Sequence, residues 1–244
     1  MRFFIFSDMK STIEEIEKRF DQDVERFSNL DTGQATTLDA AHNLELITEA
    51  ITRHYPSGIS VLDLGCGAGN FSVKLSQKVT DANYTLIDLS RPMLDRASQR
   101  LSGLTKGKVH TIKGDFRSQT LSENQFDVII ATAVLHHLRD DQDWETSFKK
   151  LYSLLKPGGS IWIFDLVEQH TSAMQQYIYR DLYGGYLKDL EDADYRDQVF
   201  AYIQKEDSPR SLIYQLELLQ RVGFSSVDVL HKNLCFASFV GFKR

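Results

Sequence analysis

The chain has 244 residues, of which 42% are hydrophobic, enough to bury a full α/β core in one domain. Its formal net charge of −6 argues against a broad nucleic-acid surface, because phosphate binding requires clustered Lys and Arg. The amino terminus has only four consecutive apolar residues, and no later apolar run could cross a membrane, so we expect a cytoplasmic protein. Cys66 and Cys235 offer neither metal-ligand spacing nor a disulfide framework, so no metal site is expected.

Two helices are expected ahead of the core. Ser11 followed by Glu14 indicates a capping box at the start of the first helix. An apolar stripe at near-helical spacing follows, made of Ile13, Ile16, Phe20, Val24 and Phe27. A second helix is expected over residues 36–54, stopped by Pro56 and Gly58. The stripe must be covered, so the first helix docks on the core or lies over a ligand.

The most informative stretch runs from Val61 to Asn70, with the sequence VLDLGCGAGN. A short apolar run followed by alternating glycines predicts a buried strand, a tight loop and the start of a helix. Because glycine has no Cβ, a flat polar ligand can lie against the backbone of this loop at a helix N-terminus. A dinucleotide-binding fingerprint would require a further glycine where Asn70 stands.

Carboxylates follow the next two predicted strands. The strand Asn83–Asp88 ends in Asp88, whose two oxygens are suited to accept hydrogen bonds from both hydroxyls of a ribose. The strand Val109–Lys113 is followed by Asp115 and Phe116, a carboxylate beside an aromatic ring. An adenine ring requires both kinds of contact, so the pattern indicates an adenosine-containing ligand.

In this order and spacing, the motifs resemble those of class I S-adenosylmethionine-dependent methyltransferases over about residues 59–166. The match continues with FDVIIATAVLHHL, for the fourth strand and its tip, and LLKPGGSIWIFDL, for a helix, a turn and the fifth strand. The resemblance implies a methyltransferase with a doubly wound, seven-stranded, mostly parallel Rossmann-like α/β sheet. It also implies S-adenosylmethionine or its carboxylated form as cofactor. The implied cofactor contacts are Asp63, Gly65, Cys66, Gly67, Gly69, Asp88, Leu89, Met93, Asp115, Phe116 and Thr132.

His136 and His137 follow the fourth strand and are the candidate catalytic residues. Imidazole titrates near neutrality, so either ring could act as a general base. The alternative is that one imidazole only hydrogen-bonds the backbone and shapes the site. The Asn-Pro-Pro-Tyr motif of amino-directed nucleic-acid methyltransferases is absent, and ATAVLHH stands there instead, which disfavours methylation of adenine or cytosine.

The sequence organises as one methyltransferase domain with four parts. Residues 1–58 are expected to form a helical lid and scaffold, residues 59–166 the cofactor-binding core, residues 167–207 a helical cap, and residues 208–244 a helix and a β-hairpin. The last helix is expected to begin with Ser208 as its cap and Pro209 at its first position, before strands at 226–231 and 234–241. The cap carries tyrosines that either recognise an acceptor or pack on the core: Tyr177, Tyr179, Tyr183, Tyr186, Tyr195 and Tyr202.

A narrower resemblance concerns the cap and the carboxyl-terminal part. Both are similar to carboxymethyltransferases that use carboxy-S-adenosylmethionine on the wobble uridine of tRNA. In that family an arginine from the insertion holds the extra carboxylate, and the candidates are Arg180, Arg196 and Arg210. The expected partner is a small-molecule acceptor, and tRNA is the alternative. A homodimer is also an open possibility. A non-catalytic cofactor-binding protein is the second alternative.

Overall fold

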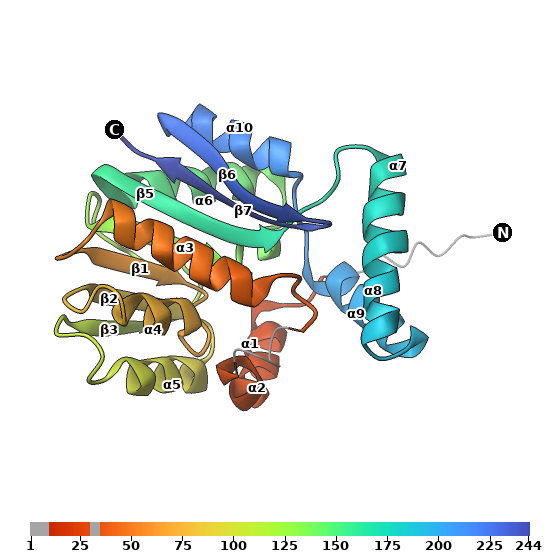
Figure 1. The fold of residues 1–244 in the computed structure, drawn as a ribbon, viewed down its shortest axis with the longest axis horizontal. Coiled ribbons are helices and arrows are strands. Elements are labelled where there is room, and N and C mark those ends of the chain that lie inside the picture. Colours follow the sequence, from red (N-terminus) through yellow and green to blue (C-terminus); the bar gives the residue numbers. More distant parts are fainter. Residues whose placement is uncertain (1–9, 30–34) are drawn as a thin grey trace.

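The computed structural model describes residues 10–29 and 35–244 of the chain. Its centre is a seven-stranded sheet with the order β3-β2-β1-β4-β5-β7-β6 (Figure 1). Strand β7 is antiparallel to both neighbours, and the other neighbouring pairs are parallel. The predicted doubly wound, mostly parallel sheet is therefore confirmed. The strands are β1 (Ser60–Leu64), β2 (Asn83–Asp88), β3 (Val109–Lys113), β4 (Phe126–Thr132), β5 (Leu155–Leu166), β6 (Ser226–Asn233) and β7 (Phe236–Phe242).

Helices flank the sheet and extend beyond one of its edges (Figure 1). Those of the amino-terminal part and the core are α1 (Ile13–Gln22), α2 (Val24–Ser28), α3 (Ala40–His54), α4 (Asn70–Ser76), α5 (Arg91–Leu101), the 3₁₀ turn η1 (Leu135–His137) and α6 (Asp141–Leu154). Those after β5 are α7 (Ser172–Met174), the π-helical η2 (Gln175–Tyr183), α8 (Gly184–Leu190), α9 (Ala193–Glu206) and α10 (Leu212–Val222). The insertion between β5 and α10 is therefore helical, as the sequence indicates.

Alternate side chains of the central strands serve two separate cores, one on each face of the sheet. Val128 and Ile130 of β4 pack in a cluster with residues of α3, α4 and α5. Ile129 and Ala131 of the same strand pack in the other cluster, with residues of α6 and α10. This alternation follows from the two-residue period of a strand, and it explains why β4 is apolar throughout.

The carboxyl ends of the parallel strands meet at one edge of the sheet, where ligands bind in doubly wound folds. Asp63, Asp88, Thr132 and Asp165 lie at or next to these ends, on β1, β2, β4 and β5. Figure 1 shows the cap helices beyond this edge, with α1 and α2 beside them. The fold therefore brings the strand-end carboxylates, the lid and the cap to one region.

Several predicted helix starts are wrong. The capping box of α1 uses Thr12 and Glu15, one residue later than predicted, because the Ser11 hydroxyl donates to Glu206 at 2.6 Å instead. The predicted first helix is interrupted at Asp23, which caps both α1 and α2.

The start of α10 also differs from the prediction. The N-cap is Ser211, whose hydroxyl accepts from the Tyr214 N–H, and not Ser208 followed by Pro209. Ser208 instead donates its backbone N–H to the carbonyl of His136 at 2.7 Å. The predicted first turn of the helix is therefore an extended segment, and its bond to His136 connects the cap to the tip of β4.

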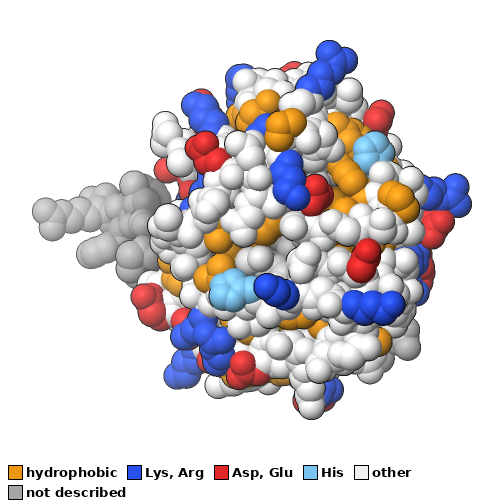
Figure 2. Space-filling model, turned by 90° about the vertical axis from the view of Figure 1, so that its left-hand side faces the viewer, with side chains coloured by type: hydrophobic (Ala, Val, Ile, Leu, Met, Phe, Trp, Pro, Cys, Tyr) orange, Lys and Arg blue, Asp and Glu red, His pale blue; other side chains and the backbone are white. Residues whose placement is uncertain are grey.

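Within the two described stretches, no helix combines the length and apolarity needed to cross a membrane. On the face seen in Figure 2, Lys and Arg side chains are interspersed with Asp and Glu side chains. Of the basic residues on α5, Arg100 donates to the Ala68 carbonyl and Arg96 to the Ser28 hydroxyl, so both are engaged within the molecule.

Candidate active site

The glycine loop after β1 is held open toward a cavity. The Gly67 N–H donates to the Asp88 carboxylate at 2.8 Å, and Gly67 has a φ of +49°. A Cβ built on Gly67 would meet no atom within 4 Å, so the backbone there faces free space. Gly69 has another role, because a Cβ there would lie 2.9 Å from the Ala97 Cβ, where α4 and α5 approach closely.

A first cavity of about 130 Å³ lies over this loop. Ile16, Phe20 and Phe27 of the amino-terminal helices line it, so the predicted apolar stripe covers the cavity. The predicted site residues that also line it are Asp63, Gly65, Cys66, Gly67, Asp88, Leu89, Met93, Thr132 and His137. Residues from the loops after β1, β2 and β4 thus form one wall, and the lid forms the other.

A second cavity of about 300 Å³ shares Gly65, Asp88, Leu89 and His137 with the first and adds Asp115 and Phe116. Arg117 donates to both carboxylate oxygens of Asp115 at 3.0 and 2.9 Å. Burial opposes the charge on Asp115, but these hydrogen bonds lower its pKa below the usual value. Gly69 and His136 line neither cavity.

Two carboxylates at the strand ends are hard to ionise without a ligand. Burial raises the pKa of Asp88 to about 6, against hydrogen bonds from the backbone N–H groups of Ser90 and Gly67. Burial also raises the pKa of Asp63 to about 7, assisted by the charge of Asp88 and opposed by the Ser72 hydroxyl at 2.5 Å. Hydrogen-bond donors or a positive charge in the cavity would stabilise both ionised forms, which fits the ribose hydroxyls and the ammonium group of S-adenosylmethionine.

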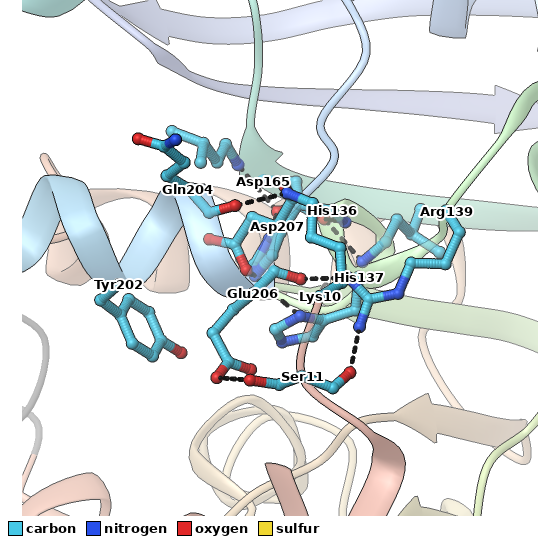
Figure 3. A network of polar contacts seen from close by, with 12 residues as sticks. Lys10, Ser11, His136, His137, Arg139, Asp165, Tyr202, Gln204, Glu206 and Asp207 are labelled. Atoms are coloured by element: carbon cyan, nitrogen blue, oxygen red, sulfur yellow. Dashed lines mark hydrogen bonds and ion pairs between the residues drawn. The ribbon is translucent and has the colours of Figure 1, made fainter. Parts of the chain in front are cut away.

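The two histidines of η1 lie in different environments (Figure 3). His136 Nδ1 contacts the carboxylate of Asp165, which also accepts from the backbone N–H groups of Leu135 and His136 at 2.8 and 3.2 Å. Burial opposes a charge on His136, but the carboxylates of Asp165 and Asp207 outweigh it and raise its pKa to about 9. Burial and the neighbouring His136 lower the pKa of His137.

A third cavity, of about 400 Å³, lies beside the histidines, between the lid and the cap. Its walls include His136, His137, Asp207 and Arg19, with aromatic side chains from the lid and the cap. His137 lines all three cavities, so it stands between the glycine-loop side and the cap side. Of the two histidines, His137 is therefore the better placed to contact a group that passes from the glycine-loop side to the cap side.

Sequence reasoning missed Asp165, Asp207 and Arg19. Asp165 has a recoverable signal, because it lies near the end of a parallel strand, as Asp63 and Asp88 do. Asp207 has none, since it follows the last turn of α9 within a run of charged residues. Arg19 lies on α1, and its guanidinium binds the buried Glu206 at 2.7 Å.

The three arginines that were candidates for holding an extra carboxylate lie outside these cavities. Arg180, Arg196 and Arg210 line none of the three cavities. Arg196 pairs with Asp197 at 2.8 Å and Arg210 with Asp141 at 2.9 Å. The guanidinium of Arg180 lies 4.7 Å from the centre of the Phe200 ring.

The cap tyrosines divide between both roles considered from the sequence. Tyr179 and Tyr183 are buried in the core cluster, and Tyr186 and Tyr195 pack against it. Of the six cap tyrosines, those that line the third cavity are Tyr183, Tyr195 and Tyr202. Most of these rings therefore attach the cap to the core, and some also face the cavity.

The chain is similar to known methyltransferases along much of its length. A family profile described as a methyltransferase domain matches residues 61–159. Carboxy-S-adenosyl-L-methionine synthase of Campylobacter lari is 27% identical over 241 residues, covering 93% of this chain and 96% of the relative. Malonyl-[acyl-carrier protein] O-methyltransferase of Priestia megaterium is 32% identical over 142 residues, covering 56% of this chain and 48% of the relative.

Among solved structures, human N-acetylserotonin methyltransferase, in complex with S-adenosylmethionine, superposes with a TM-score of 0.60 at 17% identity. The superposition covers 95% of this chain and 57% of the human chain, and it shows a shared fold. The sheet order, the glycine loop under a covered cavity and the match to the methyltransferase profile agree with one another. Residues 61–159 thus match a methyltransferase domain, and the chain has the fold of the class I S-adenosylmethionine-dependent methyltransferases.

Proposed function

We propose that this enzyme transfers a methyl group from S-adenosylmethionine to a small-molecule acceptor bound under the cap. One observation carries the proposal. His137 lines both the cavity over the glycine loop and the cavity under the cap, so a cofactor on one side and an acceptor on the other would meet beside it. The enclosing lid residues would exclude water from that meeting point.

The cofactor would lie along the first two cavities. Asp88 would accept hydrogen bonds from the ribose, and Asp115 and Phe116 would contact the adenine. Met93 and Leu89 supply apolar contact, and the glycine loop gives the methionine part close access to the backbone. Gly69 would contribute indirectly, by allowing α4 to pack against α5.

The reaction requires alignment more than acid–base chemistry. The bound sulfonium makes its methyl group electrophilic, so the protein must present a nucleophile in line with the departing sulfur. We propose His136 and His137 as the residues that act on the acceptor, with His137 the nearer. Asp165 orients His136 through its Nδ1 contact and its bonds from the backbone of η1.

The third cavity favours a small acceptor. Its volume of about 400 Å³ and its mixture of aromatic rings with Arg19, His137 and Asp207 suit a molecule of metabolite size that carries polar groups. The relative from Priestia megaterium is named as an O-methyltransferase of a malonyl group on a carrier protein, which supports an oxygen acceptor here. Action on tRNA, a homodimer and a cytoplasmic location stay predictions from the sequence.

A second candidate is use of the carboxylated cofactor. It is favoured by the 27% identity to a carboxy-S-adenosyl-L-methionine synthase over 93% of this chain. The positions of Arg180, Arg196 and Arg210 outside the three cavities disfavour it. We therefore give preference to plain S-adenosylmethionine.

Mass spectrometry and calorimetry test this function. We expect the ligand that co-purifies to be S-adenosylmethionine or its homocysteine product, and calorimetry to show tighter binding of these than of NAD. Cofactor carrying a labelled methyl group, incubated with fractions of small metabolites, should pass the label to one fraction. Preference for NAD, or transfer of the label only to RNA, would contradict the proposal.

A further inference from the structure

We infer that His136, His137 and Asp207 form a binding site for a divalent first-row transition metal ion, to which an oxygen atom of the acceptor would bind. Each residue offers one ligand atom, and the three atoms lie within 4.8 Å of one another. The inference that the ion binds depends on these residues alone. The inference that the ion contacts the acceptor also depends on the proposed function. The inference runs against the expectation of no metal site, which considered only the cysteines.

The spacing of the ligand atoms suits a metal ion. Asp207 Oδ1 lies 3.2 Å from His137 Nδ1 and 3.7 Å from His136 Nε2. Metal–ligand bonds of 2.0–2.1 Å at tetrahedral angles place neighbouring ligand atoms about 3.3 Å apart. The two measured separations bracket this value, and the ligand atoms of the two histidines lie within 4.8 Å of each other.

Two of the ligand atoms are buried with few polar partners. Asp207 Oδ1 and His137 Nδ1 are buried, and within the described parts of the chain they contact each other at 3.2 Å, with His136 Nε2 at 3.7 Å from Asp207 Oδ1. Lys10 donates to the backbone carbonyl of Asp207. The side chain of Asp207 is only 3% exposed. A buried polar atom without a partner is costly, and a metal ion would satisfy both atoms at once.

Asp165 supplies the support that a metal-binding histidine usually has. Its carboxylate contacts His136 Nδ1 and is itself fixed by the Leu135 and His136 N–H groups. This contact orients the ring so that Nε2 points toward Asp207 (Figure 3). A carboxylate bound to the far nitrogen of a histidine ligand is the common outer-shell arrangement in metal sites.

The donor set and its surroundings indicate which ion and which ligand would bind. Two imidazoles and one carboxylate are borderline ligands that suit Zn²⁺ or Fe²⁺ better than Mg²⁺ or Ca²⁺. Two buried carboxylates, Asp165 and Asp207, would balance a divalent charge. The third cavity borders all three ligand residues, so a bound ion would be open on that side to an acceptor hydroxyl, carbonyl or carboxylate oxygen.

The site would also join two parts of the fold. Both histidines belong to η1 at the tip of β4, whereas Asp207 follows α9 of the cap. A bound ion would therefore tie the cap to the core and stabilise the folded protein, because it binds the native arrangement more tightly than the unfolded chain. This effect gives a readout that does not depend on activity.

The test uses the full chain after treatment with a chelator. We expect Co²⁺ to give saturable visible absorption bands, Zn²⁺ to displace it, and Zn²⁺ to raise the melting temperature. Asp207→Asn and His137→Ala should each weaken Co²⁺ binding by at least about tenfold, and Asp165→Asn by about 10- to 100-fold. Circular dichroism of each variant checks that it is folded, and Asp165→Asn tests the inference without removing a ligand.

Asp39→Asn is the matched control. Asp39 lies 2.7 Å from His231 on the surface, with His42 beside that ring, so it is another carboxylate close to two histidines. Its substitution should leave Co²⁺ binding unchanged. Absence of saturable binding, or equal loss in Asp39→Asn and Asp207→Asn, would overturn the inference. Calorimetry of S-adenosylmethionine with the same metal-free protein tests the proposed function separately from the metal site. The protein could bind the cofactor without binding Co²⁺, or bind Co²⁺ without binding the cofactor.

Discussion

The carboxylate of Asp88, at the end of β2, accepts a hydrogen bond of 2.8 Å from the backbone N–H of Gly67 in the glycine loop. Its other oxygen accepts from the Ser90 N–H at 2.9 Å. Each carboxylate oxygen keeps further acceptor capacity, so Asp88 can bind a ligand while it still holds the loop. The loop and the predicted ribose acceptor are therefore fixed relative to each other by one side chain.

Asp88→Ala should weaken the binding of S-adenosylmethionine by about 1–3 kcal/mol, through loss of charge-assisted hydrogen bonds and of the tie to Gly67. Isothermal calorimetry measures the change directly. Asp95→Ala is the control, because Asp95 is an exposed carboxylate of α5 away from both cofactor cavities. Equal affinities for the wild-type protein and the Asp88 variant would contradict the assignment of Asp88 as the ribose acceptor.

Cofactor affinity should depend on pH below neutrality. The pKa of Asp88 is raised to about 6 by burial, so its acceptor form predominates only above that pH. Binding that requires the ionised carboxylate should weaken by up to about tenfold for each pH unit below 6. Because the pKa of Asp63 is raised to about 7, the loss should begin near neutrality. Calorimetry between pH 5 and 8 tests this, and a constant affinity in a folded protein would refute it.

Much of the fold could be predicted because the core strands carry local signals. Strand Asn83–Asp88 was predicted at its observed bounds, since an apolar run ending in a carboxylate is visible without knowledge of its neighbours. The glycine loop is equally local, because Gly65 and Gly67 need backbone freedom that other residues lack. Sites at the carboxyl edge of a parallel sheet follow from these local features and the strand order.

Contacts between distant segments could not be predicted in the same way. The residues around Ser11 indicate a helix cap, and nothing local indicates a bond to Glu206. The structure nevertheless joins Ser11 to Glu206 across most of the chain. The position of Asp207 beside His136 and His137 depends on how the cap folds back on η1. Helix starts at Thr12 and Ser211 differ from prediction because long-range contacts decide between neighbouring serines and threonines.

Gly67→Val should abolish detectable cofactor binding, because its side chain would enter the first cavity from a backbone with a φ of +49°. Gly58→Val is a matched control, since Gly58 has a φ of +66° and also faces free space, but lies outside the cavity. Both variants should lose about 1–2 kcal/mol of stability from the left-handed backbone. Thermal unfolding and calorimetry together should show similar destabilisation and a binding defect in the Gly67 variant alone.

Cofactor discrimination should not depend on the arginines of the cap. Arg180→Ala, Arg196→Ala and Arg210→Ala should leave the ratio of affinities for plain and carboxylated cofactor unchanged, because none of these residues lines a cavity of the site. A bidentate guanidinium contact would change this ratio by about 1.5–3 kcal/mol. Titration with both cofactors measures it. A preference for the carboxylated form that one of these changes abolishes would favour the carboxymethyltransferase hypothesis.

His137→Ala should retain most of the cofactor affinity while turnover falls by about 10²- to 10⁴-fold. His137 lines both the cavity over the glycine loop and the cavity under the cap. We therefore expect its imidazole to act on the acceptor more than to hold the cofactor. His170→Ala is the control, because His170 is exposed and lines none of the three cavities. Single-turnover transfer of a labelled methyl group separates the chemical step from binding. If turnover stays near the wild-type value, alignment of the acceptor by the cap alone carries the reaction and the role proposed for His137 is wrong.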